Sequence, residues 1–151
     1  MPASIISDTS CLNLLEKIEA LELLHQLYGQ VLTTEKVALE LGAPLPGWIR
    51  IQNPTDFKSL RILEASLDHG EASAIALALE QEDCLLIIDE LKGRKMAQQL
   101  GLAITSTLGV IAAAKLRRQL SSVKPLLEKI KETNFRISEE LEQAILAQVG
   151  E

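Results

Sequence analysis

The sequence predicts an α/β fold in which helices cover a parallel sheet. Short apolar runs alternate with segments of helical pattern, and this rhythm is typical of parallel strands joined by crossover helices. Residues 72–80 (ASAIALALE) are apolar on nearly every side, which indicates a deeply buried helix. The composition is 47% hydrophobic but only 3% aromatic, so we expect an aliphatic core.

The predicted strands are short apolar runs that end at polar or turn residues. Residues 84–88 (CLLII) are the clearest, because the run ends directly at Asp89. Residues 4–7 (SIIS) end in the same way at Asp8. The predicted strands are residues 4–7, 30–32, 48–52, 84–88 and 102–104.

The predicted helices are marked by capping residues at their starts and by glycines at their ends. Thr9 or Ser10 caps the first helix, and Thr34 caps the third. Gly42 ends this third helix, and Gly101 ends the helix at residues 90–100. The predicted helices are residues 11–18, 21–28, 35–41, 56–67, 72–80, 90–100, 108–120, 123–133 and 138–149.

Length and composition limit the class of protein. The 151 residues suit a single domain, residues 1–151, with a core in 1–120 and C-terminal helices in 121–151. The two cysteines, Cys11 and Cys84, are too few for a secreted disulfide framework, so we interpret them as reduced core thiols. No signal-peptide pattern and no membrane-spanning apolar stretch occurs, so we expect no membrane partner and a cytoplasmic location.

Polar side chains follow the predicted strands at the point where each strand ends. Asp8 follows the first strand, Asp89 follows residues 84–88, and Thr105 and Ser106 follow the last strand. The carboxyl ends of parallel strands meet at one edge of the sheet, and ligands bind beyond that edge. We therefore expect these side chains to lie near one another.

Two further acids are placed to approach the same edge from helices. Glu40 is about 60° around the helical wheel from Val37 and borders the core face. Glu71 lies in the first turn of the buried helix. Clustered carboxylates repel one another unless a cation or a proton intervenes. Oxygen ligands of this kind suit Mg²⁺ or Mn²⁺, which activate water and neutralise charge on a phosphodiester.

Each acid also has a purely structural interpretation. Asp8, Glu71 and Asp89 stand at helix starts, where a carboxylate caps the helix or is favoured by its dipole. Glu40 can be a solvated helix residue. We interpret Glu90 as the surface acid of its pair with Asp89, although the two roles can be exchanged.

The order of these motifs resembles the PIN-domain superfamily of metal-dependent ribonucleases. The resemblance is strongest to a prokaryotic branch related to VapC-type toxins. The segments that carry it are IISDTSCLNLL (5–15), TTEKVALEL (33–41), LDHGEASAIALALE (67–80), CLLIIDELKGRKMAQQLGL (84–102) and ITSTLGVIAAAKLRRQL (104–120).

The resemblance implies a fold, a site and partners. The implied fold is a Rossmann-like three-layer sandwich with four or five parallel strands. The implied catalytic and metal-binding acids are Asp8, Glu40, Glu71 and Asp89, which would hold Mg²⁺ or Mn²⁺. The polar turn at 105–107 orients water or metal in such proteins. RNA is the implied substrate, a homodimer is the implied assembly, and toxin-type members bind a small antitoxin protein.

Three positions depart from the pattern of this superfamily. Glu71 stands where active nucleases usually carry Asp, although a Gly-Glu pair is common in this branch. Ser73 stands where related sequences often carry a second Glu, and Ser106 stands where they often carry Gly.

The remaining candidates are basic and hydroxyl residues close to the acids. The formal net charge of −6 excludes attraction of nucleic acid by the overall field, so binding requires local basic groups or cations. Lys92 and Arg94 are candidates for phosphate contacts, and a solvated helix face is their structural alternative. Thr105 and Ser106 are the other substrate-binding candidates; the secondary candidates are Ser10, Glu90 and Thr107.

The leading hypothesis is a Mg²⁺- or Mn²⁺-dependent endoribonuclease, with the toxin of a toxin–antitoxin pair as one form of it. The alternative is a catalytically weak or inactive PIN-like module that binds RNA or a protein. A receiver-like phosphoacceptor would need an acidic pair after the first strand and a lysine after the last, and a haloacid-dehalogenase-type phosphatase would need Asp-x-Asp. Ser10 follows Asp8-Thr9 here, and residues 105–107 contain no lysine, so both are disfavoured.

Overall fold

The computed structural model describes residues 2–151 and contains one five-stranded parallel sheet. The strand order is β3-β2-β1-β4-β5. The strands are β1 (Ser4–Ser7), β2 (Val31–Thr33), β3 (Ile49–Ile51), β4 (Cys84–Ile87) and β5 (Ala103–Thr105). All four pairings are parallel, which confirms the predicted α/β class and its five-stranded form.

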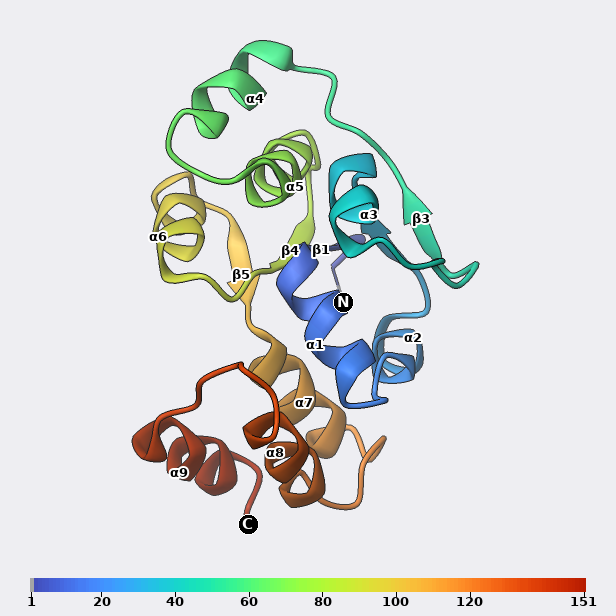
Figure 1. Cartoon of the computed structure of the whole chain (residues 1–151), viewed down its shortest axis with the longest axis vertical. Coiled ribbons are helices and arrows are strands. Elements are labelled where there is room, and N and C mark those ends of the chain that lie inside the picture. Colours follow the sequence, from blue (N-terminus) through green and yellow to red (C-terminus); the bar gives the residue numbers. More distant parts are fainter. Residues whose placement is uncertain (1) are drawn as a thin grey trace.

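Nine helices flank this sheet within residues 2–151 (Figure 1). They are α1 (Thr9–Lys17), α2 (Glu22–Tyr28), α3 (Glu35–Leu41), α4 (Phe57–Glu64), α5 (His69–Leu79), α6 (Leu91–Gln99), α7 (Thr107–Leu116), α8 (Lys124–Lys131) and α9 (Glu139–Gln148). In the same residues, no helix has the length and apolar character needed to cross a membrane.

The chain changes the side of β1 on which it adds strands, and the change falls between β1 and β4. The chain adds β2 and β3 on one side of β1, then crosses back to add β4 and β5 on the other side. Ser7 is in register with Ile87, and the Asp8 backbone N–H donates to the Ile87 carbonyl at 3.1 Å. Asp8 and Asp89 therefore leave neighbouring strands at the switch point, where open α/β sheets bind ligands.

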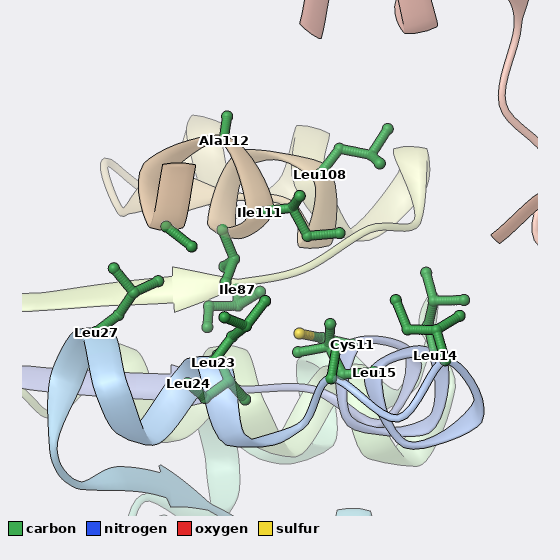
Figure 2. Close-up of a cluster of buried hydrophobic side chains, with 14 of the residues drawn as sticks. Cys11, Leu14, Leu15, Leu23, Leu24, Leu27, Ile87, Leu108, Ile111 and Ala112 are labelled. Carbon is green, nitrogen blue, oxygen red and sulfur yellow. The ribbon is translucent and has the colours of Figure 1, made fainter. Parts of the chain in front are cut away.

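The core lies on both faces of the sheet and is almost wholly aliphatic. On one face, side chains of α1 and α2 meet those of α7, with Ile87 of β4 between them (Figure 2). On the other face, α5 packs over Ile6, Leu86 and Ile88. The helix α5 is buried along nearly its whole length, as the apolar run predicted.

The C-terminal helices extend the first of these two core clusters. Val123, Leu127 and Ile130 are fully buried there, and Ile145 of α9 joins them. Figure 1 shows α8 and α9 beside α7, at the end of the molecule opposite α4. These helices therefore belong to the packed body of the protein.

Some predicted boundaries were wrong, and the reason is local capping. Asp8, rather than Thr9 or Ser10, caps α1, because its carboxylate accepts the Cys11 N–H. The helix α5 begins at His69, three residues earlier than predicted, since Asp68 caps it. Thr105 lies within β5 and not after it.

Candidate metal centre

Asp8 is the innermost acid of the site. It is fully buried at the end of β1, where Oδ1 accepts the Cys11 N–H at 3.1 Å. Its other oxygen, Oδ2, is buried without a hydrogen-bond partner. Burial and the nearby charges of Asp89 and Asp68 raise the pKa of Asp8 to about 8, although the Cys11 and Asp89 amides oppose this shift. An unpartnered buried carboxylate oxygen is costly, and it is explained if a proton or a cation binds it.

Glu71 has the same unusual character as Asp8. Its side chain is 7% exposed in the first turn of α5, and Oε2 is buried without a hydrogen-bond partner. Burial and the neighbouring Asp68, Glu90 and Asp8 raise its pKa to about 8. The carboxylate lies against Gly93 of α6, where an added Cβ would stand 2.7 Å from Oε2. A glutamate at position 71 therefore fits because residue 93 of the neighbouring helix is a glycine.

The carboxylate of Asp89 is held by the first residue of α7, the helix that follows β5. Its Oδ1 accepts the Thr107 N–H at 2.8 Å, and its Oδ2 accepts the Thr107 hydroxyl at 2.6 Å. Burial raises the pKa of Asp89, while Thr107 and the charge of Arg94 oppose the rise. Glu90, and not Asp89, occupies the capping position of α6. The interpretation of Asp89 as a plain helix cap was therefore wrong.

Glu40 approaches the site from the last turn of α3 and remains exposed to solvent. Its Oε2 accepts the Thr9 hydroxyl at 2.7 Å. Its carboxylate also lies against Gly70 of α5, since a Cβ there would stand 2.5 Å from Oε2. Glu40 thus contacts the first turns of α1 and α5 through Thr9 and Gly70, which are the sequence neighbours of Asp8 and Glu71.

A fifth acid, Asp68, stands at the same place and was not among the predicted site residues. Its Oδ1 accepts the Glu71 N–H at 2.9 Å, which makes it the cap of α5. Its charge raises the pKa values of both Asp8 and Glu71. The sequence signal that could have found it is the Asp-x-x-Glu spacing of residues 68–71, just before the apolar run.

Of the two basic candidates in α6, Arg94 is hydrogen-bonded within the fold and Lys92 faces solvent. Arg94 Nη1 donates to the Ile88 carbonyl at 2.9 Å, so its guanidinium lies against the end of β4. Lys92 is exposed in the first turn of α6. Arg94 thus places a positive charge beside Asp89, and Lys92 places a second one on the surface, where a ligand can reach it.

The hydroxyl candidates are mostly used within the fold. Ser106 caps α7 by accepting the Gly109 N–H, and Thr105 Oγ1 lies against the Cα of Gly109. Ser10 lines a separate hollow of about 170 Å³ with Asn134 and Phe135. Thr107 is the exception, because it holds Asp89 directly.

The donor set fits a hard divalent cation. Asp8 and Glu71 each offer an oxygen that lacks a partner, and carboxylate oxygens are the ligands that Mg²⁺ and Mn²⁺ prefer. In the conformation of residues 2–151, no three acidic, histidine or cysteine side chains converge on a single point. The acids are gathered at one edge, and the longer side chains of Glu40 and Glu71 have rotatable bonds with which to close on an ion.

Fold and site together define an α/β domain with a carboxylate cluster at the switch point of a parallel sheet. A family model described as a PIN domain matches residues 4–151. The chain belongs to the PIN domain family, whose members are typically nucleases and commonly use divalent metals. No curated protein matches this chain.

Proposed function

We propose that this protein is a Mg²⁺- or Mn²⁺-dependent endoribonuclease. The observation that carries the proposal is the pair of buried carboxylate oxygens, Asp8 Oδ2 and Glu71 Oε2, that lack hydrogen-bond partners beside further acids. A structural role accounts for one oxygen of Asp8, which caps α1, and leaves the other unexplained. Membership of the PIN domain family supports a nuclease over other uses of such a cluster.

Each residue of the centre has a distinct part in this proposal. Asp8, Glu40, Glu71 and Asp89 hold the cation, and Thr107 keeps the Asp89 carboxylate in one orientation. When bound, the cation would lower the pKa of a coordinated water and neutralise charge on the scissile phosphodiester. The exposed Lys92 binds the RNA backbone, while Arg94 steadies the end of β4 through Ile88.

The test of this proposal is cleavage of a mixed set of labelled RNAs by pure protein. We expect cleavage with Mg²⁺ or Mn²⁺ and none with EDTA. Asp8→Asn should lower the rate by about 100-fold or more, the scale seen when one stabiliser of transition-state charge is removed. The asparagine can still accept the Cys11 N–H, so the helix cap is kept.

The matched control is Asp56→Asn, the same substitution at the cap of α4. Asp56 accepts the Ser59 N–H at 3.2 Å and lies outside the acid cluster. Its substitution should leave cleavage unchanged. Metal-independent cleavage, or equal rates for Asp8→Asn and wild type, would contradict the proposal.

A second candidate is a PIN-like module that binds RNA or a protein without cutting. The observation that favours it is at Ser73, where related sequences often carry a second glutamate. Ser73 Oγ is hydrogen-bonded to Thr34 Oγ1 at 2.6 Å and to the Gly70 carbonyl at 2.9 Å, so it adds no charge to the centre. RNA binding without metal-dependent cleavage by folded protein would establish this candidate.

We further propose a toxin role, with a homodimer and a small antitoxin as partners. Its support is the resemblance of the motif order to VapC-type toxins. Controlled expression should then arrest growth, while Asp8→Asn should not. Light scattering should give twice the 16.5 kDa mass of the chain.

A further inference from the structure

Asp68 contacts Glu71, one of the two acids whose oxygens lack partners, and its charge also reaches the other, Asp8. It caps α5 through Oδ1, which accepts the Glu71 N–H at 2.9 Å. The same turn of α5 carries Gly70, against which the Glu40 carboxylate lies. Buried Asp8 and Glu71 both experience its charge. Asp68, Glu71 and the Glu40 carboxylate thus lie around the N-terminal turn of α5, and Asp68 is the one with no part yet in the metal centre.

Capping does not require the charge of Asp68. Serine, threonine and asparagine cap helices about as well as aspartate. Thr34, Ser106 and Ser138 do so in α3, α7 and α9. A negative charge beside Glu71 and Asp8 adds repulsion that a neutral cap would avoid. The repulsion is relieved if a cation occupies the space between these acids.

Asp68 has an oxygen available for such a cation. Oδ1 is used by the cap, and within residues 2–151 no ion pair engages the side chain. The Asp68 and Glu71 carboxyl groups are close enough to share a hydrogen bond while Glu71 is protonated, and a cation can take the place of that shared proton. The side chain is exposed, so a hydrated ion can reach it from solvent. The unpartnered Asp8 Oδ2 and Glu71 Oε2 are the buried counterparts on the inner side.

We propose that Asp68 is a fifth acidic ligand of the metal centre, with Oδ1 capping α5 and Oδ2 facing a divalent cation. The inference rests on the proposed metal-dependent function and extends its ligand set. Asp68 joins the first turn of α5 directly to the cation. The residue acts on the outer, solvent-facing side of the centre, opposite the buried Asp8.

The test is titration calorimetry of metal-free protein with Mn²⁺, together with thermal melting in EDTA. Asp68→Asn keeps an acceptor for the Glu71 N–H and removes only the charge. We expect Mn²⁺ affinity to fall at least tenfold, while the melting temperature in EDTA stays the same or rises because repulsion is relieved. Asp68→Ser, a second neutral cap, should behave alike.

The matched control is again Asp56→Asn, which removes a capping charge far from the cluster and should leave the Mn²⁺ affinity unchanged. Wild-type affinity in folded Asp68→Asn and Asp68→Ser would overturn the inference and leave the proposed function intact. Failure of the wild type itself to bind Mn²⁺ would instead contradict the proposed function, and the inference with it.

Discussion

At the scale of single residues, the acids of the centre differ in their burial and in their hydrogen bonds. Asp8 and Glu71 are buried with one unpartnered oxygen each, and both have pKa values raised to about 8. Asp89 is equally close to the sheet, but the Thr107 N–H and hydroxyl satisfy both of its oxygens. Two acids therefore take protons in the metal-free protein near neutral pH, and a third remains oriented and hydrogen-bonded.

These pKa shifts predict how the stability of the metal-free protein depends on pH. The unfolded chain loses the Asp8 and Glu71 protons near pH 3.8 and 4.5, and the folded chain keeps them until about pH 8. The unfolded state binds fewer protons over this interval, so stability falls as pH rises from about 4.5 to about 8 and then levels off. Each group contributes a slope of up to about 1.4 kcal/mol per pH unit.

Urea denaturation in EDTA at a series of pH values measures this dependence. Asp8→Asn and Glu71→Gln should each flatten the profile, because one proton no longer differs between the two states. With Mn²⁺ in excess the trend should reverse, since the cation binds ionised carboxylates. Stability that is independent of pH between 5 and 8 in EDTA would show that these acids are already ionised in the folded state.

At the scale of elements, glycines in the first turns of two helices leave room for carboxylates that arrive from neighbouring helices. The three atoms nearest to a Cβ at Gly70 of α5 would be those of the Glu40 carboxylate, at 2.5–2.9 Å. A Cβ at Gly93 of α6 would meet both Glu71 Oε2 and Ile88 Cδ1 at 2.7 Å. A substitution in α5 therefore acts first on Glu40, whereas a substitution in α6 also disturbs the core.

Gly70→Ala should separate metal binding from stability. The Glu40 carboxylate is the end of a flexible, exposed side chain, so it can swing aside at little cost in folding free energy. Alanine is favoured over glycine within a helix by up to about 1 kcal/mol, so the metal-free protein should be no less stable than wild type. Mn²⁺ affinity should nevertheless fall, because Glu40 leaves its place between Thr9 and Gly70 at the edge of the centre.

Calorimetric titration with Mn²⁺ and thermal melting in EDTA check both halves of this expectation. Gly47→Ala is the control, since a Cβ at Gly47 meets nothing within 4 Å. Unchanged Mn²⁺ affinity in Gly70→Ala would remove Glu40 from the ligand set.

At the scale of the whole molecule, the C-terminal helices share a core with the sheet. Leu127 and Ile130 of α8 belong to the same buried cluster as Leu15 of α1 and Ile111 of α7. The sheet face with Ile87 adjoins this cluster (Figure 2). A continuous core of this kind predicts that residues 121–151 unfold together with residues 1–120 as one cooperative unit.

Leu127→Ala tests this cooperativity. Leu127 is 1% exposed, and truncation of a buried leucine costs about 2–5 kcal/mol. Trp48, the only tryptophan, directly precedes the edge strand β3 and lies outside the C-terminal helices, so its fluorescence reports unfolding of the sheet region. We expect fluorescence and far-UV circular dichroism to shift together to lower denaturant concentration. A transition seen by circular dichroism alone would mean that the C-terminal helices melt separately.

Local pattern in the sequence was sufficient for the class of fold and for part of the site. The apolar runs that end at Asp8 and Asp89 predicted parallel strands, and parallel strands place their carboxyl ends at one edge. The apolar run of α5 predicted its burial. These features follow from the periodicity and burial of short segments, so no knowledge of distant contacts was needed.

Contacts between distant segments decided the rest of the site. Three contacts became visible only in the packed structure. Thr107 binds Asp89, the Glu40 carboxylate lies against Gly70, and Arg94 donates to the Ile88 carbonyl. Asp68 was not among the predicted site residues, and only the packed structure brings its charge within reach of Asp8. The physical reason is that the rotation and approach of each helix are set by side-chain packing across the sheet, which local periodicity does not encode.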